Sequence, residues 1–187
     1  QSFELGIKHN LGLGTEWGLV YFQNRIDQLA DSESTPSGLI YSTVDTDQKG
    51  FEAFYNSTLT DAVRYQFSYS YLDAKVRNSS QDGIYFGSAI GSQLIRRPMH
   101  KWLFATYWDL NEQSTIGAQW MSVANREDPS GVRFEDFSLL RIFANQALTD
   151  SFKLYFRVEN VFDENYQWPA GYSGAPRSVA VGASWSF

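Results

Sequence analysis

The chain of 187 residues is long enough for one domain, carries a net charge of −6 and contains no cysteine. Disulfide frameworks and thiolate metal sites are therefore excluded. The negative charge argues against a nucleic-acid-binding surface, because phosphate recognition needs concentrated Lys and Arg. Aromatic residues reach 17%, yet the mean hydropathy is −0.36, and no run approaches the roughly 18 apolar residues of a membrane-spanning helix.

Alternation of apolar and polar residues predicts β-strands along the whole chain and no helix. The clearest interior strand is 63–75, where Phe67 and Tyr71 alternate with Arg64 and Ser70. In 134–146 apolar residues crowd both faces, so the orientation of that strand is ambiguous. The nine expected strands cover approximately residues 2–10, 15–26, 38–57, 63–75, 101–109, 115–120, 134–146, 152–159 and 177–187.

The links between these strands alternate between short and long. Short links are expected at 11–14, 58–62, 110–113 and 147–150, and long links at 27–37, 76–98, 125–133 and 161–176. This sorting is typical of an up-and-down membrane wall with tight turns at one face and long loops at the other. A Greek-key sandwich has no reason to sort its loops in this way. Strands of about 9 to 13 residues also suit a tilted membrane crossing.

The last eleven residues, 177–187, carry the strongest single signal. Val179, Val181, Trp185 and Phe187 fall on one face, while the other face holds small and mostly polar residues. An aromatic carboxy-terminal residue in register with an apolar face suits a membrane interface, where aromatic rings are enriched. We therefore expect an all-β fold, an antiparallel up-and-down transmembrane β-barrel segment.

Nine strands are not expected to form a complete barrel. Bacterial single-chain barrels have an even number of strands, and an open sheet would expose unpaired backbone groups to hydrocarbon. We therefore expect the missing strands to come from sequence before residue 1 or from a partner chain. The final strand is then expected to pair with the first strand of that missing part.

The carboxy-terminal third resembles the TonB-dependent outer-membrane receptors. The stretch Asn160-Val-Phe-Asp-Glu-Asn-Tyr166 is similar to the family's Asn-Leu-Phe-Asp-x-x-Tyr element, with Val161 in place of the common Leu. A Gly-Arg-like pair, here Pro176-Arg177, and a terminal aromatic follow. The residues that match the motif are Asn160, Phe162, Asp163, Tyr166, Arg177 and Phe187. Upstream, Phe22–Leu29, Lys49-Gly-Phe-Glu52 and Arg97-Pro-Met-His100 agree with the resemblance.

The resemblance covers essentially the whole chain and implies that residues 1–187 form the carboxy-terminal portion of a barrel of about 22 strands. It implies active transport of a scarce nutrient, an iron-siderophore or a cobalamin, across the outer membrane of a Gram-negative bacterium. The plug domain and the earlier strands would lie outside this chain. The implied partners are those missing parts, the TonB complex acting through the plug, outer-membrane lipid, the barrel-assembly machinery that reads Phe187, and the small-molecule ligand. No nucleic acid and no cofactor are expected.

Four residues are candidates for ligand contact. Arg96 and Arg97 end a long link and can meet an anionic ligand, although a loop arginine is more often a solvated charge. Trp168 and Tyr172 can stack on a ligand, although anchoring at a membrane interface is the simpler role for such rings. Likewise, the simpler role for residues 160–166 is to end a strand at the outer membrane interface, rather than to contact a ligand.

Neither a metal site nor an active site is predicted. The acidic residues near the first long link carry the hard oxygen ligands that calcium takes. Their spacing matches no ordered cation-binding loop, so we expect them to form a charged rim instead. They are Asp27, Asp31, Glu33, Asp45 and Asp47. Catalysis is not expected, because only His9 and His100 are present and no Ser or Asp is marked as their partner by spacing.

Two alternatives to a TonB-dependent receptor stay open. One is a passive porin-like outer-membrane channel, which would have no plug sequence upstream of the barrel. The other is a soluble β-sandwich or barrel binding protein that carries the motif by chance. A fragment that is soluble and monomeric without detergent would favour this second alternative.

Overall fold

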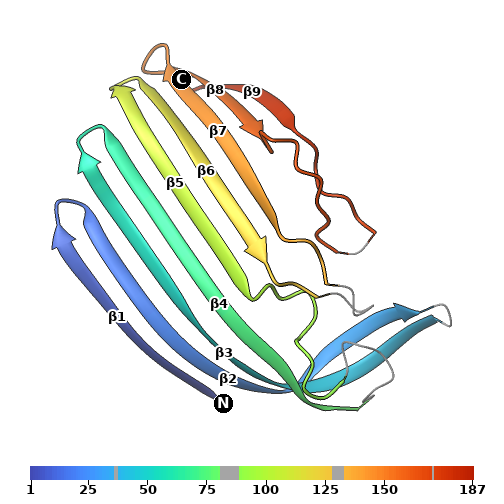
Figure 1. Cartoon of the computed structure of the whole chain (residues 1–187). Coiled ribbons are helices and arrows are strands. Elements are labelled where there is room, and N and C mark those ends of the chain that lie inside the picture. Colours follow the sequence, from blue (N-terminus) through green and yellow to red (C-terminus); the bar gives the residue numbers. More distant parts are fainter. Residues whose placement is uncertain (36–37, 81–88, 128–132, 170) are drawn as a thin grey trace.

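The computed structural model describes residues 1–35, 38–80, 89–127, 133–169 and 171–187. These residues form one antiparallel sheet of nine strands, in which each strand pairs with its neighbours in sequence (Figure 1). The strands are β1 (Ser2–Gly12), β2 (Thr15–Thr35), β3 (Gly38–Thr60), β4 (Val63–Ser79), β5 (His100–Asn111), β6 (Ser114–Ala124), β7 (Phe137–Ala147), β8 (Phe152–Glu159) and β9 (Ser178–Trp185). The described residues include no helix that is long and apolar enough to span a membrane.

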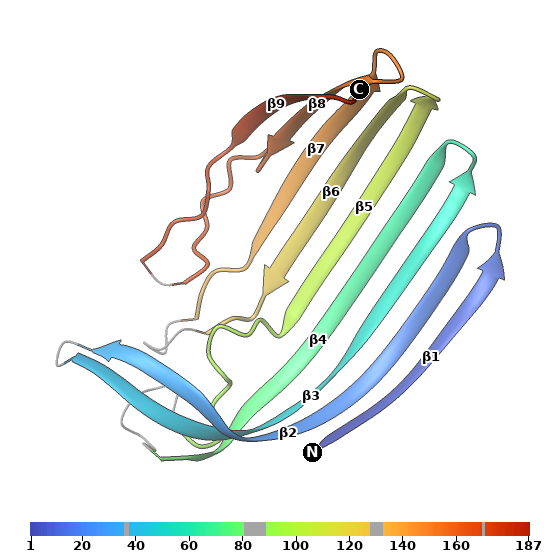
Figure 2. The same cartoon turned by 180° about the vertical axis from the view of Figure 1, so that it is seen from behind.

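The sheet curves into an open wall (Figures 1 and 2). Tight turns lie at one end of the wall, and the longer links between β4 and β5, β6 and β7, and β8 and β9 lie at the other. We call these the turn end and the long-link end. The chain begins at the long-link end of β1 and finishes at the turn end of β9 (Figure 1). Among the described residues, β1 and β9 each pair on one side only.

The nine expected strands are confirmed, with one correction at the first long link, 27–37. That segment was expected to be a loop, but β2 continues to Thr35 and β3 begins directly opposite at Gly38. A β-bulge between Ile26 and Leu29 interrupts the alternation, with Gln28 in the left-handed region at a φ of 57°. The period-two alternation in the sequence therefore stops at this bulge, before the strand itself ends. The hydrogen-bonded ladder between β2 and β3 continues beyond the bulge.

One face of the sheet is apolar and aromatic. On β4 to β6, the register brings together on this face Tyr65, Phe67, Tyr69, Trp102, Phe104, Trp108, Ile116 and Trp120. On β9, Val181 and Trp185 are 76% and 74% exposed, so no second layer covers them. An apolar face without a covering layer is the property expected of a wall that contacts lipid.

The opposite face of the sheet is polar. It nevertheless receives an aromatic ring from β7, which accounts for the apolar residues on both faces of that strand. Leu140 and Ile142 lie on the apolar face, whereas Phe143 lies on the polar face. Phe143 sits directly opposite Gly117, where a Cβ atom would lie 2.4 Å from its ring. The large ring therefore fills the space left by glycine on the neighbouring strand, a pairing that supports curved sheets.

A small buried cluster lies at the long-link end. It consists of Val44, Ala74, Val76 and Leu94. Leu94 comes from the link between β4 and β5, which runs along the edge of β4: its N–H donates to the carbonyl of Ala74 at 2.7 Å. In the described part of the chain, apolar burial is thus concentrated where a link folds back onto a strand. The spanning part of the wall is held instead by its ladder of backbone hydrogen bonds.

Candidate functional site

The polar face is crossed by hydrogen bonds between side chains of neighbouring strands. Arg64 of β4 pairs with Asp109 of β5 at 3.0 Å. Arg141 of β7 donates to Gln119 of β6 at 3.0 Å and to Glu159 at the end of β8 at 2.7 Å. These partners lie on one face because the antiparallel register places them side by side. A polar, laterally bonded face of this kind is typical of a barrel interior.

The motif residues after β8 fasten the chain before β9. Asn160 is 5% exposed, and its amide donates to the carbonyls of Glu164 and Ala175 at 2.9 and 3.1 Å. Its side-chain oxygen accepts the N–H of Glu164 at 2.8 Å. The carboxylate of Asp163 accepts the N–H of Arg177 at 2.7 Å. The side chains of two motif residues, Asn160 and Asp163, therefore bind backbone groups of the link 160–177 and fix where β9 begins.

Arg126, just after β6, is buried among aromatic rings at the long-link end. Its guanidinium lies 4.6 Å from the ring centre of Phe134, 5.5 Å from Phe137 and 5.1 Å from Trp168. Tyr166 stacks on Phe137 with ring centres 4.6 Å apart. We call Arg126, Phe134, Phe137, Tyr166 and Trp168 the aromatic–arginine cluster. Because a desolvated guanidinium is attracted to ring faces, the cluster joins the links after β6 and β8.

The structure places one of the four candidate ligand residues in this cluster and a second beside the residue that follows Arg126. Trp168 belongs to it, and Arg126 also donates to the carbonyl of the preceding residue, Gln167. The N–H of Arg96 donates to the carbonyl of Glu127, adjacent to Arg126, at 2.8 Å. Arg96 is exposed and lies in a turn, with a φ of 59° in the left-handed region.

The remaining candidates are exposed at the surface. Arg97 follows Arg96, and Tyr172 is 72% exposed in the link before β9. The motif residue Phe162 is 73% exposed, as an anchoring ring at an interface would be. Phe187 lies at the opposite, turn end and is fully exposed, while the preceding residue, Ser186, still donates its N–H to the carbonyl of Ser151.

Sequence reasoning did not single out Arg126. Its ring partners are residues 134 and 137, which lead into β7, and residue 168, which comes from the link after β8. No local spacing marks such a residue. The hint in the sequence is an arginine two residues after an amphipathic strand, and that is also the usual pattern for a solvated strand end.

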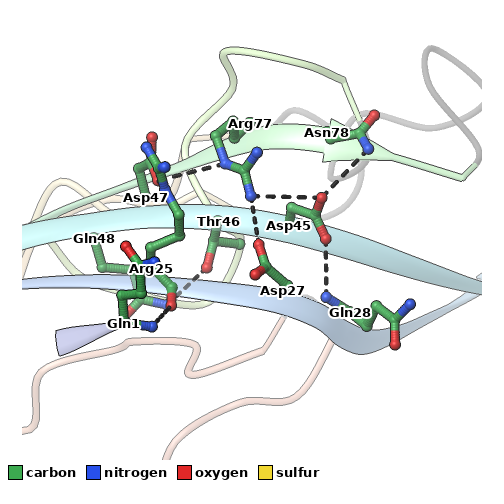
Figure 3. A network of polar contacts seen from close by, with 10 residues as sticks. All are labelled: Gln1, Arg25, Asp27, Gln28, Asp45, Thr46, Asp47, Gln48, Arg77 and Asn78. Carbon is green, nitrogen blue, oxygen red and sulfur yellow. Dashed lines mark hydrogen bonds and ion pairs between the residues drawn. The ribbon is translucent and has the colours of Figure 1, made fainter.

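A second network of charges lies where β2 and β3 bend, and Figure 3 shows it. Arg77 of β4 reaches the carboxylates of Asp27, Asp45 and Asp47, with distances of 3.6 Å to Asp45 and 3.5 Å to Asp47. Arg25 binds Asp47 at 3.0 Å. Three of the five acidic residues considered as calcium ligands are thus engaged by arginines. Among the described residues, no group of three or more potential metal ligands is found.

The backbone also contributes to this network. The N–H of Gln28, at the bulge of β2, donates to the carboxylate of Asp45 at 2.9 Å. This hydrogen bond holds the pKa of Asp45 below its usual value, and the side chain of Asn78 and the charge of Arg77 act in the same direction. The carboxylate is therefore kept ionised where it closes the bend. The side chains of Asp31 and Glu33 lie outside the described part of the structure.

A single meander of long strands, apolar on one face and polar on the other, with the long links at one end, defines the wall of an outer-membrane type of β-barrel. The chain belongs to the TonB dependent receptor-like β-barrel family, whose family model matches residues 1–161. This confirms the resemblance stated from the carboxy-terminal motif. The match ends where that motif begins, so it rests mainly on other residues.

Individual relatives agree with the family. The vitamin B12 transporter BtuB of Photobacterium profundum is 26% identical over 184 residues, which is 92% of this chain and 28% of the relative. The ferripyoverdine receptor of Pseudomonas aeruginosa is 23% identical over 100% of this chain and 25% of its own length. This chain therefore spans between a quarter and a third of the length of these curated relatives.

Solved structures agree on the fold. The ferric-catecholate import receptor Fiu of E. coli K12 in its closed form matches 100% of this chain and 27% of its own chain. The TM-score is 0.77 at 19% identity. The expected fold class, a nine-strand antiparallel segment of a β-barrel, is confirmed.

Proposed function

We propose that this chain is the carboxy-terminal barrel wall of an outer-membrane receptor that takes up a scarce nutrient in a Gram-negative bacterium. The observation that carries the proposal is the family match over residues 1–161 on a sheet with one apolar and one polar face. In this proposal, residues 1–187 are the last part of a barrel of about 22 strands. The earlier strands and a plug domain belong to the same receptor outside this chain.

The proposed nutrient is an iron-siderophore or a cobalamin. Relatives named as a vitamin B12 transporter and as a ferripyoverdine receptor match the chain at similar identity, 26% and 23%, so both classes of ligand are retained. Transport is driven by the TonB complex acting through the plug. The apolar face contacts outer-membrane lipid, and Phe187 is read by the barrel-assembly machinery. The family is one of receptors and transporters, which supports a role without catalysis.

The long-link end is the proposed ligand-binding end. Arg96 and Arg97 supply positive charge for an anionic chelate, and Trp168 and Tyr172 supply rings that can stack on a planar ligand. Arg126 acts as a positioning residue, because it packs against Trp168 and holds the segment that carries it. Ligand contact by these residues requires that the rest of the barrel surround them.

Uptake by the full receptor tests this function. A strain without the receptor is supplied with labelled cobalamin and with several labelled ferric siderophores, one at a time. We expect uptake of one ligand class to be lost, and restored by the receptor only in cells with an intact TonB complex. Uptake that needs no TonB complex would instead support a passive channel, and unchanged uptake of every ligand would contradict nutrient import.

Point variants of the restored receptor locate the ligand. Replacing Trp168 by Ala is expected to weaken binding about tenfold, on the scale of 1 to 3 kcal/mol for a stacked ring. Asp61→Ala, in the turn between β3 and β4 at the opposite end, is the control and is expected to bind normally. Equal affinity of both variants would contradict the placement of the ligand.

A further inference from the structure

The apolar face of the sheet is hollowed between β4 and β8, near the turn end. The floor of the hollow carries small side chains, Thr106 of β5, Ala118 of β6 and Ala144 of β7. Larger rings stand beside this floor, since Tyr65 lies next to Thr106 and Phe156 next to Ala144. The volume of the hollow is about 650 Å³. We call it the apolar-face hollow.

A polar pair lies on the same face, on the side of the hollow toward the turn end. Ser114 of β6 and Gln146 of β7 are directly opposite each other, and the Ser114 hydroxyl donates to the Gln146 amide oxygen at 2.6 Å. Leu110 and Leu148 on either side are 49% and 53% exposed, so apolar surface continues around the pair. Because polar groups are costly in hydrocarbon, this pair suits the ester region of a lipid better than its chains.

The turns next to the hollow are acidic. The turns between β3 and β4, β5 and β6, and β7 and β8 each hold one carboxylate and no Lys or Arg: Asp61, Glu112 and Asp150. All three residues are exposed. The cations near these strand ends, Arg64 and Lys153, lie on the polar face instead. The acidic turns therefore attract a cationic headgroup and repel an anionic one.

The size of the hollow favours a small amphiphile over a protein. Eleven of the described residues line it, whereas a stable protein–protein interface takes about 20–30 residues from each partner. Its volume falls within the range of about 300–1,000 Å³ that is usual for small-molecule sites. Toward the turn end, the apolar walls, the polar pair and the acidic turns follow one another. A phospholipid has the same order of acyl chain, ester region and charged headgroup.

We propose that the apolar-face hollow holds an acyl chain of a phospholipid with an ammonium headgroup. Its ester region meets Ser114 and Gln146, and its ammonium group meets the acidic turns. The short turns of outer-membrane barrels face the periplasm, so the lipid belongs to the periplasmic leaflet. The site requires the apolar face to lie in the membrane, which is part of the proposed function, but it does not require nutrient uptake.

Photolabelling of the full receptor tests the site. The receptor is placed in vesicles of equal parts phosphatidylethanolamine and phosphatidylglycerol, with a trace of one of the two lipids carrying a photoreactive group in its acyl chain. We expect phosphatidylethanolamine to label peptides of β5 to β7 several-fold more than phosphatidylglycerol does. Peptides of β1, whose turn holds no carboxylate at 13–14, are expected to be labelled equally by both. Equal labelling of β5 to β7 by the two lipids would overturn the proposal.

Filling the hollow gives a matched pair of variants. Ala118→Phe places a ring on the floor, and Ala183→Phe places the same ring on the apolar face of β9, outside the hollow. Heat-dependent mobility in gels establishes that each barrel is folded. We expect Ala118→Phe to abolish the preference for phosphatidylethanolamine and Ala183→Phe to retain it. A preference that survives in folded Ala118→Phe contradicts the site.

Removing the charges tests the headgroup without altering the hollow. Asp61→Asn, Glu112→Gln and Asp150→Asn together are expected to make labelling by the two lipids equal. Glu135→Gln, at an exposed position of the long-link end, is the control and is expected to keep the preference. Persistence of the preference in the triple variant would contradict the assignment of an ammonium headgroup.

The remaining outcomes separate the site from the proposed function. Cross-linking of two receptors through Ala118→Cys would show a second copy in the hollow and would overturn the lipid site. Lack of labelling of β5 to β7 by either lipid would reject both the site and the membrane contact of the apolar face. The expected preference in a receptor that takes up no nutrient would support the site and contradict nutrient import alone.

Discussion

At the scale of single residues, glycine on the polar face makes room for an aromatic ring on the neighbouring strand. A Cβ at Gly117 would lie 2.4 Å from the ring of Phe143 and 2.7 Å from the carbonyl oxygen of Thr106. Gly18 stands in the same relation to Phe54, which lies opposite it. The contact with Thr106 is the more restrictive one, because a backbone oxygen in the ladder cannot rotate away.

Gly117→Ala is therefore expected to lower the free energy of unfolding of the receptor by about 1–3 kcal/mol, as overpacking does. Gly182→Ala is the control: its Cβ would meet nothing nearer than Tyr155 at 4.0 Å, so its effect is expected within about 0.5 kcal/mol. Urea unfolding of the receptor in detergent micelles measures both. Equal stabilities of the two variants would contradict this account of the glycine.

Asn160 shows how a family motif acts through backbone hydrogen bonds. Asn160→Gly removes the amide that binds Glu164 and Ala175 but tolerates the φ of 48°. Loss of these buried hydrogen bonds is expected to cost about 1–3 kcal/mol and to make the link 161–177 susceptible to proteolysis. Asn165→Gly, at an exposed position of the same link, is expected to resist the protease like the parent.

At the scale of elements, the hairpin of β2 and β3 continues past the other strands and bends (Figure 2). Two irregularities permit the bend, the bulge of β2 at 26–29 and a register shift of β3 at Asp45. Arg77 lies at this level and contacts one carboxylate of β2 and two of β3. The bend is thus fixed by a side chain from a third strand.

Arg77→Met is expected to free the outer part of the hairpin. Exposed ion pairs contribute little individually, so the expected change is about 1 kcal/mol after solvent screening, seen as about fivefold faster amide exchange in residues 27–35. Lys75→Met changes a neighbouring charge on the same strand that has no ion pair among the described residues. Faster exchange in both variants alike would show that Arg77 has no specific role.

The bend is also expected to depend on pH. Because the pKa of Asp45 is lowered in the folded chain, its stabilising contacts are present above the usual pKa of about 3.9 and are lost as the pH falls below it. Spin labels on Tyr41→Cys in the hairpin and Asp61→Cys at the turn end report the distance between them. We expect the distribution of that distance to broaden below about pH 4. When Asp45→Asn is added, we expect the distribution to be independent of pH.

At the scale of the whole molecule, the wall has one apolar and one polar face, as expected of a sheet with lipid on one side and water on the other. Ala53 lies on the apolar face between Leu19 and Tyr69, and Ser68 lies on the polar face of the adjacent strand. Ala53→Arg is expected to lower the free energy of unfolding in lipid vesicles by about 2–4 kcal/mol, whereas Ser68→Arg faces the lumen and costs little. A larger loss of unfolding free energy for Ser68→Arg than for Ala53→Arg would reverse the assignment of the two faces.

Much of this molecule was predictable because period-two alternation is a local property. Val63 to Tyr71 and the stretch from Val179 to Trp185 follow it without interruption, and those strands and faces are confirmed. The extension of β2 to Thr35 was missed because the bulge at Gln28 breaks the alternation while leaving the ladder intact. The proposed ligand residues stay predictions.

The sequence alone determined that the chain is a meander of amphipathic strands and which family it belongs to, since each of these follows from neighbouring residues along the chain. Only the tertiary structure decided that Arg126 packs against Trp168 and that Arg77 holds the hairpin. It also decided that Arg141 and Arg157 share Glu159. Such contacts join residues from separate strands and links, and their partners are set by register and curvature rather than by spacing in the sequence.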